Sequence, residues 1–274
     1  VYTSLILLDS TDDLEDSLTV LLEVTPGHCP TLRIYAQYWI VDMSGFGLRF
    51  CDGASDLLGT VLIESEDRKS YTKKIHRIKT PGRQWTIGEE GMSIYYTERQ
   101  KIAVSVDLYK GDMSGKPERK VRSEWSDLLD ISNITPKTVF SVDETNSNRK
   151  YEFCYEVENA SGSFGRSKII KIFSRFHVIN LSKSALYIAQ QGVPNETSFV
   201  PPQGSIPFHF EDGSFPLAIC LSTNCVNWTN GSVCLDKVGI TSMKLHDSSD
   251  VSPVLQVEVR LASKDHNGAV VILV

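Results

Sequence analysis

The 274-residue sequence lacks any apolar run near the ~20 residues that a membrane-spanning helix needs. It also lacks excess positive charge, since 28 Lys and Arg face 34 Asp and Glu, for a net charge of −6. Phosphate contacts require clustered basic side chains, so this balance argues against a nucleic-acid partner. No basic region precedes the short apolar run at residues 5–8, which argues against a signal peptide.

Motifs for catalysis and for metal binding are missing as well. The sequence has no Gly-x-Ser-x-Gly, no Walker loop, no Gly-x-Gly-x-x-Gly and no His-Glu-x-x-His. His209 with Cys220, Cys225 and Cys234 matches no common zinc spacing. We interpret the acidic pair 89–90 as a solvated turn, and the basic run 73–79 as an exposed strand or loop rather than a site for anionic lipid. The sequence therefore predicts no enzyme, no metal and no cofactor.

The sequence does contain a repeat. The stretch Tyr38-Trp39-Ile40-Val41-Asp42-Met43-Ser44-Gly45 returns, at an offset of 138 (177 − 39), as Phe176-His177-Val178-Ile179-Asn180-Leu181-Ser182. Alternating apolar residues flank both copies, which predicts strand, Asx turn, strand. Asp and Asn suit such a turn because a short polar side chain can bond the backbone two residues on.

Three hairpins with strict apolar alternation accompany this repeat. Their first strands cover residues 18–24, 151–157 and 255–261, and their second strands run from 32, 169 and 269. Such alternation is typical of half-buried strands. We therefore predict an all-β fold of tandem β-sandwich modules: residues 1–31 end a preceding module, 32–168 form one module and 169–274 form another. The chain starts with Val and ends in strand-like sequence, so we expect a piece of a longer protein.

Six cysteines make disulfide bonds a question. No Cys recurs at an equivalent position of the repeat, which favours reduced thiols in the cytosol. Against this, six Asn-x-Ser/Thr sequons begin at Asn133, Asn159, Asn180, Asn195, Asn227 and Asn230. Sequons are typical of surface loops in secreted proteins. An extracellular, glycosylated and disulfide-linked receptor or adhesion fragment therefore remains the alternative.

Binding is the function for which the sequence offers candidate residues. Sandwiches built from hairpins leave edge strands that can accept an extended peptide. Aromatic and proline residues gather near the start of the second module, and the candidates for a peptide groove are Tyr187, Phe199, Pro202, Phe208 and Phe210. A Pro-containing peptide suits such a groove because it is already extended. The competing interpretation is that these residues fill the core.

The order of these motifs resembles the adaptor-binding domain of the vacuolar-protein-sorting-thirteen family of bridge-like lipid transfer proteins. The matching stretches are residues 38–45, Ser123-Glu124-Trp125-Ser126, Gly162-Ser163-Phe164-Gly165, residues 176–180, Gln190, Pro207-Phe208-His209 and Leu235-Asp236-Lys237-Val238-Gly239. They cover nearly the whole chain, and they imply β-sandwich modules.

The resemblance also implies a function. In that family the domain recognises Pro-x-Pro motifs of organelle adaptors and so places a lipid-transfer protein at membrane contact sites. This chain would then be cytoplasmic and would meet membranes only through adaptors. The family's signature Asn, important for module integrity and adaptor capture, falls on Asn180. The first module has Asp42 there, which carries charge and has no amide donor.

Overall fold

The computed structural model describes residues 2–7, 18–51, 92–95, 100–109, 119–121, 123–193, 196–245, 254–263 and 268–274. Over these residues the chain forms β-strands and one short 3₁₀ helix, η2 (Gly162–Phe164). The predicted all-β fold is confirmed. In this described part no helix is long and apolar enough to span a membrane. The acidic pair 89–90 and the basic run 73–79 lie outside the described residues.

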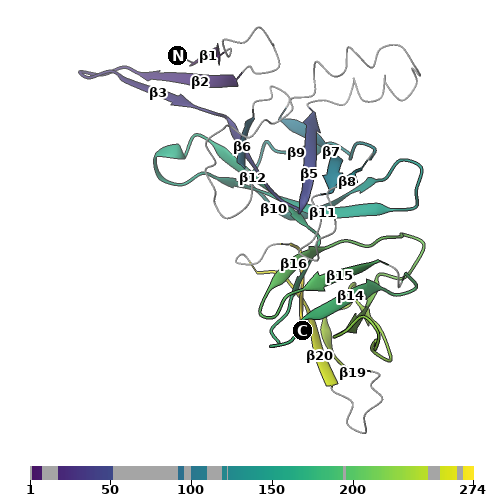
Figure 1. Ribbon diagram of the computed structural model, residues 1–274. Helices are drawn as coiled ribbons and strands as arrows, with labels where there is room; N and C mark the ends of the chain where they lie inside the picture. The colour runs from purple at the N-terminus through teal and green to yellow at the C-terminus, as the bar shows by residue number, and fades with distance from the viewer. Residues whose placement is uncertain are drawn as a thin grey trace.

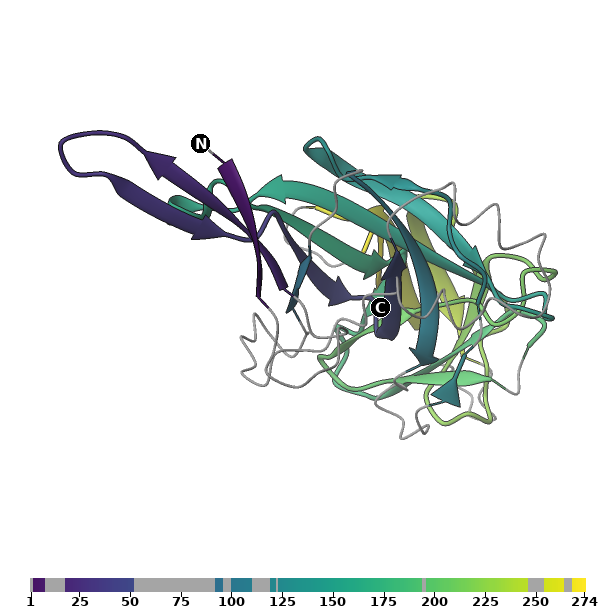
Figure 2. The ribbon, with the colours of Figure 1, turned by 90° about the horizontal axis from the view of Figure 1, so that it is seen from above.

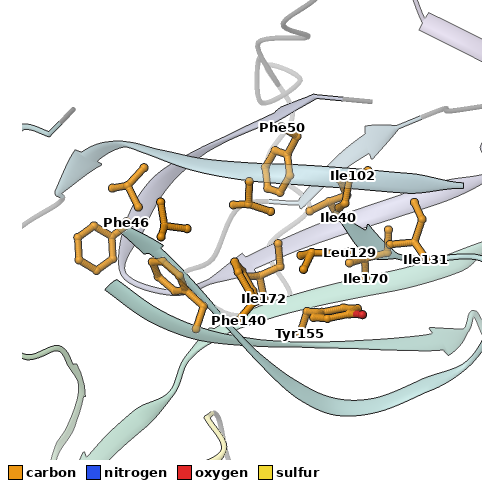
Figure 3. Packing of buried hydrophobic residues seen from close by; sticks show 14 of the residues in the cluster. Ile40, Phe46, Phe50, Ile102, Leu129, Ile131, Phe140, Tyr155, Ile170 and Ile172 are labelled. Atoms are coloured by element: carbon orange, nitrogen blue, oxygen red, sulfur yellow. The ribbon is translucent and has the colours of Figure 1, made fainter. Parts of the chain in front are cut away.

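The first sandwich packs two sheets against each other (Figure 1). One sheet has the order β10 (Thr135–Asp143), β11 (Lys150–Asn159), β12 (Lys168–Ser174), β4 (Tyr38–Met43) and β6 (Met92–Tyr95). The other has the order β5 (Phe46–Cys51), β7 (Lys101–Tyr109) and β8 (Arg119–Lys120), with β9 (Leu129–Asp130) also paired to β7. Figure 3 shows the core of this sandwich, a cluster to which Ile40, Phe46, Ile102, Ile170 and Ile172 belong.

The second sandwich repeats this plan. Its larger sheet has the order β16 (Ser205–Phe208), β13 (Phe176–Ile179), β21 (Val270–Leu273), β20 (Val254–Leu261) and β19 (Gly239–Lys244). Its smaller sheet has the order β15 (Thr197–Val200), β14 (Leu186–Gln190), β17 (Ala218–Ser222) and β18 (Val233–Cys234). A separate cluster of buried apolar side chains fills the space between them.

The same parallel pair closes both sandwiches. The strand β12 runs parallel to β4, and β21 runs parallel to β13, while the other paired strands are antiparallel. Because β12 belongs to the sheet of the first sandwich, the chain passes between the sandwiches at Ser174–Phe176, later than the predicted boundary at residue 168.

A third sheet stands before the first sandwich. It consists of β1 (Tyr2–Leu7), β2 (Leu18–Thr25) and β3 (Thr31–Tyr35), and its hairpin β2–β3 projects away from the rest of the molecule (Figures 1 and 2). Glu23 pairs with Arg33 across this hairpin, as Glu156 pairs with Lys171 across β11–β12. The hairpin therefore matches the closing hairpin of a sandwich.

The Trp-Ser/Thr element has the same role in both sandwiches. In the first, Ser126 N donates to Val104 O (2.8 Å) and Val104 N donates to Ser126 Oγ (3.0 Å). In the second, Thr229 N donates to Leu221 O (2.8 Å) and Leu221 N donates to Thr229 Oγ1 (3.2 Å). The hydroxyl thus satisfies a buried backbone amide in a central strand of each smaller sheet.

Candidate functional site

Asn180 ends β13 and lies wholly inside the second sandwich, with 0% of its surface exposed. Its Oδ1 accepts hydrogen bonds from Ser182 N (2.9 Å) and Ser182 Oγ (2.7 Å), which confirms the predicted Asx turn. Its Nδ2 faces three backbone oxygens: Ser184 O at 2.8 Å, Pro201 O at 3.0 Å and Val200 O at 3.3 Å. The amide therefore joins its own turn to the backbone that follows β15.

Asp42 forms the equivalent turn in the first sandwich. Its Oδ1 accepts from Ser44 N at 3.0 Å, which confirms the second predicted Asx turn. A carboxylate supplies this acceptor as well as an amide does, but it cannot make the donor contacts that Asn180 makes. The two copies therefore form the same turn, but only Asn180 can also donate hydrogen bonds from an amide nitrogen.

Gly45, which follows the first Asx turn, meets the second sandwich. Its φ is +80°, in the left-handed region that favours glycine. A Cβ atom there would lie 2.8 Å from Pro207 Cγ, closer than a van der Waals contact allows. The glycine of the repeated motif thus permits close approach of the two sandwiches at their joint.

His209 lies at this joint, among aromatic rings of the first sandwich. Its ring centroid is 4.5 Å from that of Phe46 and 5.3 Å from that of Phe153, and its Nε2 is 3.3 Å from Ser44 O. Burial lowers the pKa of His209 to about 4, although the hydrogen bond to Ser44 O opposes this shift. The imidazole is therefore neutral near pH 7, with Nε2 as the donor to the carbonyl.

The loop that carries His209 is held by Gln190, a side chain with 2% exposure at the end of β14. Gln190 Oε1 accepts from Glu211 N (2.8 Å) and Asp212 N (3.0 Å), while its Nε2 donates to Asp212 O (2.7 Å). Glu211 in turn forms an ion pair with Arg149 of the first sandwich. Sequence reasoning noted Gln190 only as a motif match. The sequence feature that could have identified Gln190 as a buried anchor is a glutamine that follows apolar strand positions.

The groove candidates separate into two groups. Phe208 and Phe210 are buried, each with 4% exposure, and their rings pack in the core of the second sandwich, so no peptide can contact them in this structure. Tyr187 and Phe199 are half-buried and face each other across β14 and β15, with ring centroids 5.4 Å apart. Pro202 is exposed in the turn after β15.

The pair of Tyr187 and Phe199 points away from the core. Their neighbours Leu186 and Val200 are fully buried, and side chains alternate between the two faces of a strand. Among the strands that the structure describes, β15 pairs only with β14 and so forms the edge of its sheet. A half-buried aromatic pair therefore lies on the outer face of β14 and the edge strand β15, and the end of β15 is bonded to Asn180.

The residues weighed as zinc ligands do not form a site in the described part of the chain, where no three metal-binding side chains come together. His209 lies at the joint between the sandwiches instead. Five of the six cysteines, Cys29, Cys154, Cys220, Cys225 and Cys234, are free thiols.

Comparison with known proteins places these features in a family. The family described as "Vacuolar-sorting associated protein 13, adaptor binding domain" matches residues 6–267. The intermembrane lipid transfer protein vps13B of Dictyostelium discoideum is 25% identical over 134 residues, which cover 44% of this chain and 2% of that protein. The chain thus spans a very small share of its relative's length. Because the family match extends over nearly the whole sequence, this chain belongs to the adaptor-binding-domain family of vacuolar-sorting-associated protein 13.

Proposed function

We propose that the chain captures extended Pro-x-Pro peptides of adaptor proteins at the edge strand β15 of the second sandwich. Through such adaptors it would place a longer lipid-transfer protein at membrane contact sites, on the cytoplasmic side of organelle membranes. Membership of an adaptor-binding family supports the binding role. The observation that carries the choice of site is the half-buried pair of Tyr187 and Phe199 beside an edge strand.

The geometry at β15 fits a peptide of this kind. An edge strand presents backbone N–H and C=O groups that an added strand can pair. Prolines lack the N–H group, so a peptide with Pro at alternate positions bonds through the residues between them. Its proline rings then meet the outer face, where Tyr187 and Phe199 supply aromatic contact area.

Asn180 acts in this proposal as a positioning residue. It is buried, so it does not touch the peptide. Its amide binds Pro201 O and Val200 O, directly at the end of β15. Losing these bonds would free the end of the binding strand, and this explains how one side chain can serve both module integrity and adaptor capture.

We further propose that residues 1–31 end a preceding module, and that the two sandwiches described above are the modules that follow it. Exposure of the N-terminal hairpin supports this division. Leu32 and Ile34 of β3 are 59% and 61% exposed, whereas their counterparts in β12, Ile170 and Ile172, are both 0% exposed under the second sheet of the first sandwich. An apolar face of this kind calls for a covering sheet.

Anisotropy titrations with a fluorescent Pro-x-Pro peptide test the proposal. The expected result is saturable binding that disappears when both prolines become alanine. Phe199→Ala should weaken binding by about tenfold, the equivalent of roughly 1.4 kcal/mol of aromatic contact. Phe164→Ala, at an exposed aromatic of the first sandwich, is the matched control and should bind as the unmodified chain does. Equal binding of the proline and alanine peptides would refute the proposal.

A further inference from the structure

In the first sandwich, the turn between β11 and β12 lies against the sheet that precedes it. We call the turn between the last two strands of a sandwich its closing turn, and the face of a sheet opposite the core its outer face. Arg166 in this closing turn forms an ion pair of 2.8 Å with Glu23 on the outer face of the N-terminal sheet. Next to it, Ser167 Oγ donates to Ala36 O at 2.6 Å. Glu23 is only 8% exposed as a result.

The closing turn of the second sandwich also contacts the outer face of the sheet before it, although here the face supplies the cation and the turn supplies backbone carbonyls. Lys137 stands on the outer face of the first sandwich, and its Nζ donates to Ser263 O (3.2 Å) and Gly268 O (3.1 Å) at the two ends of that turn. The same ammonium lies 5.1 Å from the ring centre of Phe173, another outer-face residue. Two successive outer faces are thus each bound by the closing turn of the following sandwich.

The larger sheet of the second sandwich offers a third outer face of the same construction. Register places Glu258 opposite Ile240 on one side and Leu273 on the other, just as Glu23 lies between Tyr2 and Arg33 in the N-terminal sheet. Both neighbours of Glu258, Ile240 and Leu273, are apolar, and Ile240 is 62% exposed.

A second apolar side chain enlarges this exposed surface. Val254 lies on the same face as Glu258, because both alternate with the buried Val257 and Val259, and it is 57% exposed. An acidic group opposite the exposed Ile240, on a face that also exposes Val254, fits a partner that brings a cation and apolar contact together.

We propose that the outer face of β19 and β20, at Ile240, Val254 and Glu258, binds the closing turn of a further module of the same kind. A basic side chain of that turn pairs with Glu258, as Arg166 pairs with Glu23, and an apolar side chain covers Ile240. The contact continues an interface that the chain already makes twice. This inference rests on the part of the proposed function in which the chain is a segment of a longer repeat protein.

Cysteine labelling in the full-length protein tests this surface. Ile240→Cys is pulsed with N-ethylmaleimide in the native and in the urea-unfolded protein, and the modified peptide is quantified by mass spectrometry. Native labelling should be slower by about tenfold or more, because the reagent must wait for local opening of the interface. Val226→Cys, at a 78% exposed position of the same sandwich, is the control and should label at nearly equal rates in both states.

A charge reversal completes the test. Glu258→Arg, added to Ile240→Cys, should restore fast labelling because it repels the basic side chain of the docked turn. Native labelling of Ile240→Cys as fast as that of Val226→Cys would overturn the proposal. Protection that varies with protein concentration would also overturn it, since a second copy would then cover the face. Labelling here does not depend on peptide binding at β15, so it can fail or succeed separately from the adaptor titration.

Discussion

Replacing Asn180 by Asp keeps the size of the side chain and removes its two N–H donors. The acceptor role toward Ser182 survives, but Ser184 O and Pro201 O lose partners at 2.8 and 3.0 Å inside a fully buried site. The two lost hydrogen bonds cost about 1 kcal/mol each, and the buried carbonyls are left facing a carboxylate. Together these effects should destabilise the second sandwich by about 2–4 kcal/mol. Asn180→Ser, a shorter side chain that retains one hydroxyl, should cost about 1–3 kcal/mol.

The reciprocal substitution Asp42→Asn is the matched control. Its new amide oxygen accepts from Ser44 N as the carboxylate does now. The turn should therefore survive, and the urea midpoint of the second sandwich should stay unchanged. The contrast between two equivalent positions isolates the donor role of Asn180.

Urea unfolding followed by peptide-resolved hydrogen exchange measures both effects. Peptides of β14 and β16 report on the second sandwich, and peptides of β7 and β11 report on the first. Asn180→Asp should lower the urea midpoint of β14 and β16 more than that of β7 and β11. An unchanged midpoint for β14 and β16 would refute the assignment of a structural role to the Nδ2 contacts.

Three further predictions concern His209, Gln190 and the thiols. The pKa of His209 is about 4 in the folded chain and has its ordinary value of 6.5 in the unfolded chain, so between pH 6.5 and pH 4 only the unfolded chain binds this proton. The free energy of unfolding should therefore fall by up to about 3 kcal/mol from pH 7 to pH 4. Urea midpoints of His209→Gln, measured over the same pH range, should not show this fall. Gln190→Glu keeps the acceptor for Glu211 N but loses the donor to Asp212 O, so the chain should lose about 1–3 kcal/mol and the amides of 211–213 should exchange faster; unchanged exchange would contradict the anchoring role. Burial raises the pKa of the Cys154 thiol to about 12, so N-ethylmaleimide should modify Cys225 and Cys234 in the native chain and Cys154 only after unfolding; a disulfide joining any of these three would instead favour the extracellular alternative.

One sequon already bears on that alternative. Asn180 begins an Asn-x-Ser motif, yet its side chain is buried and bonded on both sides. A glycan cannot be attached there in the folded state. The sequon arises from the chemistry of the Asx turn, in which Asn180 Oδ1 accepts from both the backbone N and the hydroxyl of Ser182.

Local patterns in the sequence predicted the strands of the three hairpins, the strands that flank the two turns, and both Asx turns, because alternation and turn chemistry are properties of short segments. They did not predict that β12 runs parallel to β4, a pairing between residues such as Lys168 and Tyr38 that are far apart in the chain. That pairing moves the joint between the sandwiches from residue 168 to Ser174–Phe176.

Composition also could not separate core aromatics from surface aromatics. Phe208 and Phe199 are the same residue type in similar strand sequences, but β16 turns Phe208 inward while β15 turns Phe199 outward. A shift of one position in the register exchanges the two faces, so only the three-dimensional pairing decides which ring a ligand can reach.

Hydrogen exchange at β15 with bound peptide tests the central claim most directly. The chain is saturated with the Pro-x-Pro peptide, and amide exchange of residues 197–200 is compared with that of the chain mixed with the alanine version. The account predicts slower exchange in β15 with the proline peptide only, since an added strand pairs the edge amides. Unchanged exchange in β15 while another edge, such as β19, becomes protected would contradict it.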